Sequence, residues 1–373
     1  MRLLSDTLAR LKRLPRGLPQ SAPTSTRLEP FDNFGANPGQ LNAWLYVPEN
    51  VAAGAPLVVV LHGCTQNAAG YDESSGWSRL ADQNGFVVLY PEQRRSNNPN
   101  LCFNWFSAKD AARGKGEALS IREMVAAVEA SRETDPGRVY VTGLSAGGAM
   151  AAAMLATYPE VFAGGAVIAG LPFGTAQSIP EAFDRMRGWE GSLPSALSDL
   201  VRAASSHSGD WPILSIWHGS ADQTVDQSNA SALVEQWRAL HDTPEAPGKT
   251  ELVHGYPHRV WRDPSGRDVV EEYSITGLAH GTPLDTRGSL HGEKAAPFML
   301  EAGISSTRLI GRFWGIAPDQ DLPSIAPARP DKAAEQRPQP AQPAQAAQAS
   351  AWSGQAGIGK TIEDALRSAG LMK

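Results

Sequence analysis

A serine in a glycine-rich turn has the sequence context of an enzymatic nucleophile. Gly143-Leu144-Ser145-Ala146-Gly147 comes directly after the apolar run 138–142 and directly before an alanine-rich helical pattern. A serine on a sharp strand-to-helix turn needs small residues two positions to either side, because the backbone there is crowded. Such a turn exposes the hydroxyl and points the N-terminus of the helix at a developing oxyanion. The pattern therefore predicts Ser145 as the nucleophile of an acyl transfer.

An acid is expected after the serine in the chain, because strand-turn-helix nucleophiles use the order Ser, Asp, His. Asp222 follows the apolar run 213–217 in the segment His218-Gly219-Ser220-Ala221-Asp222. Its role would be to hold the imidazole in one tautomer and to stabilise the imidazolium. Asp226 is the alternative acid, and His218 is expected to be structural.

The base is expected on the loop after the last strand. Of the eight histidines in the sequence, His280 directly follows such a run, which spans 269–275. Glycine and proline flank it, which suits an exposed and ordered loop. His291 is the alternative base. The predicted catalytic set is therefore Ser145, Asp222 and His280.

The segment His62-Gly63-Cys64-Thr65 follows the apolar run 57–61 and predicts one half of an oxyanion hole. In this arrangement the loop donates a backbone N–H to the oxyanion, together with the N–H of the residue after the nucleophile. We assign these donors to Cys64 and Ala146. His62 is expected to shape the loop rather than to act as a base.

Short apolar runs alternate with helical patterns between about 31 and 314, which is typical of a largely parallel α/β sheet. The run 57–61 lacks polar alternation, so helices are expected on both of its faces. Helices are predicted over 117–131 and 146–157. The predicted strands are 41–47, 56–61, 86–90, 138–142, 163–169, 213–217 and 269–275, with 251–261 as a further strand region.

The chain divides by composition into four parts. Residues 1–30 form a basic segment, 31–316 the catalytic domain, 317–352 a linker rich in Pro, Ala and Gln, and 353–373 a short amphipathic helix. Within the domain, some 40 residues around 171–212 stand where a short loop would suffice, and they predict a cap-like insertion.

Charge and cysteine content exclude several classes of function. The formal net charge of -6 argues against a nucleic-acid partner, which requires a basic surface. No apolar run reaches the length of a membrane-spanning helix. Two cysteines are too few for a zinc cluster, and no phosphate-binding loop is present, so no cofactor or metal is expected. By themselves the residues leave open whether Cys64 and Cys102 pair or stay free.

Five motifs follow one another in a fixed order along the chain. They are His62-Gly63-Cys64-Thr65-Gln66-Asn67, Asn104-Trp105-Phe106, Gly143-Leu144-Ser145-Ala146-Gly147-Gly148-Ala149-Met150, Gly170-Leu171-Pro172-Phe173-Gly174 and His218-Gly219-Ser220-Ala221-Asp222. Together they resemble the polyhydroxybutyrate depolymerase family of esterases. The resemblance covers about 41–280 and implies the α/β-hydrolase fold, a triad of Ser145, Asp222 and His280, and ester substrates. It also implies a disulfide between Cys64 and Cys102 that braces the oxyanion loop.

The expected function is hydrolysis of poly(3-hydroxybutyrate) or its oligomers through an acyl-enzyme, with Trp105 and Phe173 as apolar substrate-binding residues. A feruloyl or acetylxylan-type esterase is the alternative enzyme. A granule- or surface-binding protein that retains the fold is the alternative of another class. In the basic segment at the start of the chain, charged residues interrupt the apolar ones, so the pattern does not indicate a signal peptide. A cytoplasmic, granule-associated protein is therefore expected, with secretion as the alternative.

Overall fold

The computed structural model describes residues 27–189, 194–287 and 292–317. Most of the basic segment 1–30 lies outside the described residues. So do nearly all of the linker 317–352, the C-terminal helix predicted over 353–373, and His291. The described residues therefore belong almost entirely to the predicted catalytic domain.

A ten-stranded sheet forms the centre of the described chain, in the order β1-β2-β4-β3-β5-β6-β7-β10-β9-β8. Its middle strands from β4 to β10 pair in parallel. Every residue of the central strand β3 is at most 1% exposed, as its unbroken run of Val and Leu predicts. The strands are β1 Glu29–Pro30, β2 Asn42–Tyr46, β3 Leu57–Leu61, β4 Val87–Glu92, β5 Val139–Leu144, β6 Gly164–Ile168, β7 Ile213–Gly219, β8 Lys249–Val253, β9 Tyr256–Arg262 and β10 Asp268–Ile275.

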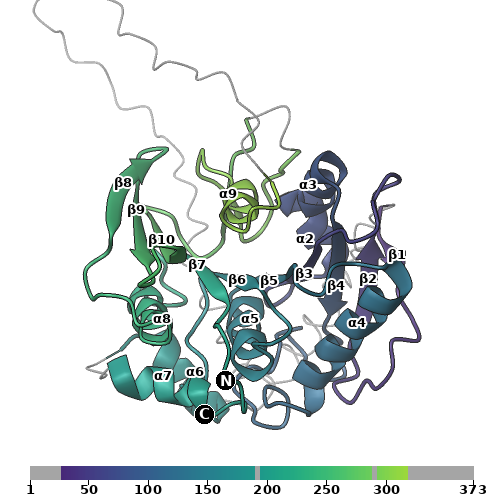
Figure 1. Cartoon of the computed structure of the whole chain (residues 1–373), viewed down its shortest axis with the longest axis horizontal. Coiled ribbons are helices and arrows are strands. Elements are labelled where there is room, and N and C mark those ends of the chain that lie inside the picture. The colour runs from purple at the N-terminus through teal and green to yellow at the C-terminus, as the bar shows by residue number, and fades with distance from the viewer. Residues whose placement is uncertain (1–26, 190–193, 288–291, 318–373) are drawn as a thin grey trace, which may run out of the picture. The chain divides into compact units, whose positions relative to one another are not determined.

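Helices cover both faces of this sheet (Figure 1). α4, α5 and α8 lie on one face, and α2, α3 and α9 lie on the other. Among the described residues, none of the helices has the length and apolar character needed to cross a bilayer. The helices are α2 Ala68–Ser75, α3 Trp77–Asn84, α4 Gly116–Arg132, α5 Ala146–Thr157, α6 Ile179–Met186, α7 Pro194–Arg202, α8 Ser228–Arg238 and α9 Ser306–Phe313.

The insertion predicted around 171–212 contains α6 and α7, between β6 and β7. α7 packs against α8 and α5, and Leu197 and Val201 are buried there. Three residues of α6 are exposed, four are partly buried and Ala182 is buried. The insertion therefore adds to the helical layer through α7, while α6 is only partly covered.

The region 251–261, expected as a strand, is a hairpin. β8 and β9 pair antiparallel and turn at His254 and Gly255, both with positive φ. β9 pairs with β10, so the hairpin extends the sheet at one edge. A two-residue hairpin turn of this kind needs φ above zero at both central positions, and His254 and Gly255 meet that requirement.

Close backbone packing fixes the start of α5 against the end of β3. A Cβ on Gly147 would lie 2.4 Å from the carbonyl oxygen of Leu61 and 2.5 Å from that of His62. A Cβ on Gly143 would lie 2.4 Å from the Gly147 carbonyl carbon. Both positions therefore require glycine on steric grounds, as the motif predicted.

Gly147→Ala should lower the free energy of unfolding by about 3 kcal/mol, because two main-chain oxygens must move to admit the methyl group. The measurement is urea denaturation. Gly248→Ala is the matched control, since its nearest neighbours lie 3.8 Å from the new atom, and it should change stability by less than about 0.5 kcal/mol. Equal denaturation midpoints for the two variants would contradict the steric argument.

Candidate active site

Ser145 lies at the sharp turn between β5 and α5. Its φ of 58° and ψ of -118° are unusual for a residue with a side chain. The turn is held from the neighbouring strand, because the Ser145 N–H donates to the Ile168 carbonyl at 2.8 Å. The residue is half-buried. A strained serine at a strand-to-helix junction is the geometry expected of an exposed nucleophile.

Asp222 and His280 form a hydrogen-bonded pair. His280 Nδ1 lies 2.7 Å from Asp222 Oδ2. The other carboxylate oxygen accepts the N–H groups of Thr224 and Val225 at 2.8 and 2.9 Å. Burial disfavours the charged carboxylate, but the hydrogen bond from His280 and the backbone donors outweigh it and hold the pKa of Asp222 below its ordinary value. The carboxylate is therefore oriented and ionised at neutral pH.

Main-chain contacts bring the loops of Asp222 and His280 together. β7 and β10 pair in parallel with Gly219 opposite Ile275, so their carboxyl ends meet. Beyond them the Ala221 N–H donates to the Leu278 carbonyl at 3.0 Å. A Cβ on Gly219 would lie 2.2 Å from that same carbonyl oxygen, so the two loops approach closely only because residue 219 is glycine.

The alternative acid takes part in different contacts. Asp226 Oδ1 accepts the Ser228 N–H at 2.9 Å at the start of α8, and the Asp226 N–H donates to Met186. Within the described chain, His280 bonds Asp222 and not Asp226, and it forms no hydrogen bond with Ser145. Catalytic hydrogen bonds are often long without substrate and tighten in the complex.

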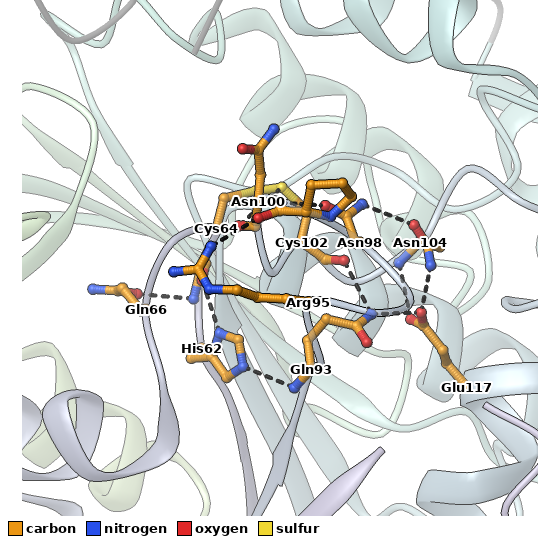
Figure 2. Close-up of a disulfide and its surroundings, with 12 residues drawn as sticks. His62, Cys64, Gln66, Gln93, Arg95, Asn98, Asn100, Cys102, Asn104 and Glu117 are labelled. Atoms are coloured by element: carbon orange, nitrogen blue, oxygen red, sulfur yellow. Dashed lines mark hydrogen bonds between the residues drawn. A yellow bond between two sulfur atoms is a disulfide. The ribbon is translucent and has the colours of Figure 1, made fainter. Parts of the chain in front are cut away.

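The loop 62–66 after β3, the predicted oxyanion loop, is crosslinked and bonded to a neighbouring loop (Figure 2). Cys64 and Cys102 form a disulfide with a Cα–Cα distance of 4.2 Å, which confirms the pairing that the family resemblance implied. The Thr65 N–H donates to the Asn100 carbonyl at 2.7 Å. On its other side, Gln66 Oε1 accepts the Gly63 N–H at 2.8 Å.

His62 and His218 both bond the backbone. His62 Nε2 accepts the Gln93 N–H at 3.1 Å, so its Nδ1 carries the proton and donates to the Gly63 carbonyl at 2.8 Å. Burial lowers the pKa of His62 and of His218, which favours neutral rings. His218 Nε2 lies 2.8 Å from the Val225 carbonyl. In the described part of the chain, no group of three or more His, Cys, Asp or Glu side chains is arranged to hold a metal ion.

A small apolar cluster adjoins both the serine turn and the acid loop. Its buried members are Ala149, Leu171 and Val225, and Trp105 and Met186 pack against them. Ala149 is one helical turn from Ser145, and Val225 is the residue whose N–H bonds Asp222. Phe173, the other predicted substrate-binding residue, packs instead against the main core.

Phe298 is a neighbour of His280 that the sequence did not reveal. The two rings lie edge to face with centroids 6.0 Å apart. Phe298 has a φ of 64°, and its carbonyl accepts the Thr282 N–H at 2.8 Å. Next to it, the Pro297 carbonyl accepts from Gln66 Nε2 at 3.2 Å. This segment therefore contacts both the histidine and the oxyanion loop, through the pairing of β11 (Thr282–Leu284) with β12 (Met299–Glu301).

Comparison with known proteins agrees with the architecture. The profile of the family described as Esterase PHB depolymerase matches residues 41–261. Poly(3-hydroxyalkanoate) depolymerase C of Paucimonas lemoignei is 47% identical over 291 residues, which cover 78% of this chain and 70% of that protein. Feruloyl esterase B of Talaromyces stipitatus is 30% identical over 267 residues, or 69% of this chain and 73% of that protein.

A solved relative shares both sequence and fold. The acetyl xylan esterase from Aspergillus awamori superposes with a TM-score of 0.62 at 31% identity, covering 68% of this chain and 93% of that chain. Its description as an esterase agrees with those of the relatives found by sequence. The predicted family and the predicted α/β-hydrolase fold are thus confirmed. The chain belongs to the esterase PHB depolymerase family and is a carboxylic ester hydrolase.

Proposed function

We propose that the chain hydrolyses esters through an acyl-enzyme formed on Ser145, with Asp222 and His280 completing the triad. His280 Nε2 accepts the hydroxyl proton as Ser145 Oγ attacks the ester carbonyl carbon. The bond to the leaving alcohol then breaks, and the imidazolium returns the proton to that alcohol. A water molecule then gives a proton to His280 and attacks the acyl carbon. The bond from that carbon to Ser145 Oγ breaks, the carboxylic acid leaves, and the imidazolium returns the proton to Ser145 Oγ.

The hydrogen bond between His280 Nδ1 and Asp222 carries this proposal, because it makes Nε2 the nitrogen with the free lone pair. The proposed oxyanion donors are the N–H groups of Cys64 and Ala146. Among the described residues the Cys64 N–H has no hydrogen-bond partner. The Ala146 N–H belongs to the first turn of α5, where amides lack intrahelical acceptors. Both groups are therefore available to an oxyanion.

The proposed substrate is poly(3-hydroxybutyrate) or its oligomers. The depolymerase of Paucimonas lemoignei is 47% identical, against 30% for the feruloyl esterase. The apolar cluster of Trp105 and Met186 on Ala149, Leu171 and Val225 suits contact with a short aliphatic acyl group, and the proposal adds Phe173 to these apolar substrate-binding residues. A feruloyl or acetylxylan-type esterase is the second candidate, supported by relatives of both kinds.

Ser145→Ala should lower kcat for a soluble short-chain ester on the order of 10⁶-fold, because the covalent path is lost while the fold is kept. The measurement is turnover of the purified variant, with circular dichroism to verify folding. Ser131→Ala, which changes an exposed serine on α4, is the control and should match the parent. A fluorophosphonate should label Ser145 and no other residue. Undiminished turnover by the folded Ser145 variant would refute the mechanism.

The substrate assignment predicts a ranking of kcat/KM. The 3-hydroxybutyrate trimer should exceed methyl ferulate and acetylated xylan by about 10- to 200-fold, the range that the fit of one group in an apolar pocket provides. The measurement is release of acid from each substrate at equal enzyme concentration, with Ser145→Ala as the blank. A higher kcat/KM for methyl ferulate or for acetylated xylan would favour the second candidate. Binding to polymer without turnover of any ester would favour a granule-binding protein that retains the fold.

We also propose that the chain is cytoplasmic and attaches to polymer granules through the amphipathic pattern in 353–373, with secretion as the alternative. The support is the order of segments in the sequence. A hydrolase domain is followed by a Pro/Ala/Gln-rich stretch and then by 353–373, where apolar residues recur at helical spacing. Tethering raises the local enzyme concentration at a surface without adding a contact to the active site.

Truncation after Ile316 should therefore spare hydrolysis of a soluble ester and slow monomer release from amorphous granules. The two substrates are assayed side by side with full-length and truncated protein. A chain in which 353–373 is replaced by a Gly/Ser stretch of equal length is the control for length alone, and it should behave like the truncated form. Equal rates on granules for all three proteins would rule out the anchor.

A further inference from the structure

The loop that contains Cys64 is held by a second loop. The disulfide joins it to Cys102 (Figure 2). The Thr65 N–H also donates to the Asn100 carbonyl. Residues 98–104 lie between β4 and α4 and belong to no helix or strand. Sheet hydrogen bonds therefore do not fix them. The position of the Cys64 N–H depends on whatever holds this second loop.

One buried carboxylate collects the bonds that hold it. Glu117 is 1% exposed and lies in the first turn of α4. It accepts the Asn104 N–H at 2.8 Å, Asn104 Nδ2 at 2.7 Å and Gln93 Nε2 at 2.6 Å. Gln93 Nε2 also donates to the Cys102 carbonyl at 3.0 Å. Glu117 is thus connected to the second loop in two ways. It bonds Asn104 directly, and it bonds Gln93, which in turn donates to the Cys102 carbonyl.

Gln93 has no freedom to turn its amide over. Its Oε1 accepts from the Arg94 N–H and from Asn97 Nδ2, both at 2.9 Å. Its two Nε2 hydrogens are used by Cys102 and Glu117. Its backbone N–H donates to His62 Nε2, at the start of the oxyanion loop. All four side-chain hydrogen-bond positions are filled, so Gln93 transmits the position of Glu117 to both ends of the crosslink.

We infer that Glu117 is a positioning residue for the oxyanion hole: its carboxylate, acting through Gln93 and Asn104, places the N–H of Cys64. This inference rests on the proposed function, because the role of that N–H belongs to the proposed mechanism. Glu117 touches no reacting atom in this arrangement. It acts on the loop through hydrogen bonds and the Cys64–Cys102 bond.

The charge state of Glu117 matters because all three of its partners are donors. Burial raises the pKa of Glu117 to about 7, and the negative charge of Asp110 acts in the same direction. Of the charged side chains on the adjoining loop, Arg94 and Arg95 bond Asn42 Oδ1 and the Pro99 carbonyl instead. A protonated Glu117 has an O–H of its own and can no longer accept from every partner.

Protonation of Glu117 affects stability and activity in opposite directions. Because its pKa is higher in the folded state than in the unfolded chain, the folded state binds the proton more tightly. Lowering the pH through 7 therefore stabilises the fold through this group. The same proton removes a hydrogen-bond acceptor from the second loop, so activity should fall over the pH range in which stability rises. A residue that only supported the fold would change stability and activity in the same direction.

Glu117→Gln tests the inference, since it keeps the size of the side chain and replaces one acceptor by a donor. On a soluble ester, kcat should fall about 10- to 100-fold, part of the 10²- to 10³-fold that loss of a whole oxyanion donor costs. KM should stay within about twofold, because the interaction is made in the transition state. The acid limb of the kcat/KM profile should lose the component near pH 7.

Two further variants separate positioning from packing. Glu293→Gln changes another buried carboxyl, whose pKa burial raises to about 8 and which bonds Ser305 and the Asp285 N–H rather than the oxyanion loop. It should keep the parental kcat even where it lowers the melting temperature. Gln93→Leu should reproduce the kcat loss of Glu117→Gln, and the double variant should lose no more than either, because both act through one network.

The inference is overturned if Glu117→Gln keeps the parental kcat and acid limb, or if Glu293→Gln loses kcat equally. If Glu117→Gln does not fold, Gln93→Leu decides by the same criteria. Thiol titration must find Cys64 and Cys102 still bonded in each variant. Failure of the proposed function is distinguishable, because it appears as full turnover by Ser145→Ala whatever the Glu117 variant does.

Discussion

The contact of α5 with the end of β3 is the constraint on which the site depends. Leu61 and His62 present their carbonyl oxygens where a side chain on Gly147 would stand. Because β3 and β5 pair in parallel, with Leu61 opposite Gly143, the segments that follow them emerge at the same edge of the sheet. One segment contains Cys64 and the other Ser145. Because Gly143 and Gly147 have no Cβ, the oxyanion loop and the serine turn can lie close together.

The proposed acid and base, Asp222 and His280, are brought together in a different way. Their loops follow β7 and β10 and are joined by main-chain hydrogen bonds such as Ala221 to Leu278. This side needs no covalent bond, because the strands themselves are in register up to Gly219 and Ile275. Beyond β3, the oxyanion loop has one main-chain hydrogen bond to its neighbouring loop among the described residues, from the Thr65 N–H to the Asn100 carbonyl, and no paired strand beside it. There a disulfide and a network of side-chain amides supply what backbone pairing supplies on the other side.

The sequence predicted the parts of this site that local signals determine. The strand, turn and helix around Ser145 are contiguous, and so is the strand that leads to Asp222. The β8–β9 hairpin was read as one strand region, because a His-Gly turn is a weak signal between apolar residues. Phe298 was not foreseen, because its approach to His280 follows from the pairing of β11 with β12. For the cysteines, composition left both states open and the family pattern supplied the pairing.

Two buried carboxylates near the site show why the partners of a group, and not its burial alone, set its charge. Asp222 accepts from His280 and from two backbone amides, and its pKa lies below the ordinary value. Glu117 also accepts three hydrogen bonds, but from neutral amides, and it faces Asp110. One pKa unit corresponds to about 1.4 kcal/mol, so a modest difference in hydrogen-bond partners is enough to shift the pKa values of the two carboxyl groups in opposite directions.

The choice of residue at each position follows from this difference. As the proposed base, His280 needs a partner that stays negative while the imidazole gains and loses its proton, and the hydrogen bonds that Asp222 accepts favour that charge. Position 117 needs an acceptor for three donors converging from Gln93 and Asn104. An amide there would direct a donor at one of them, whereas a carboxylate satisfies all three. Burial raises the pKa of Glu117 to about 7, so the carboxylate form requires neutral or alkaline pH. The proposed positioning of the oxyanion loop requires the same pH range.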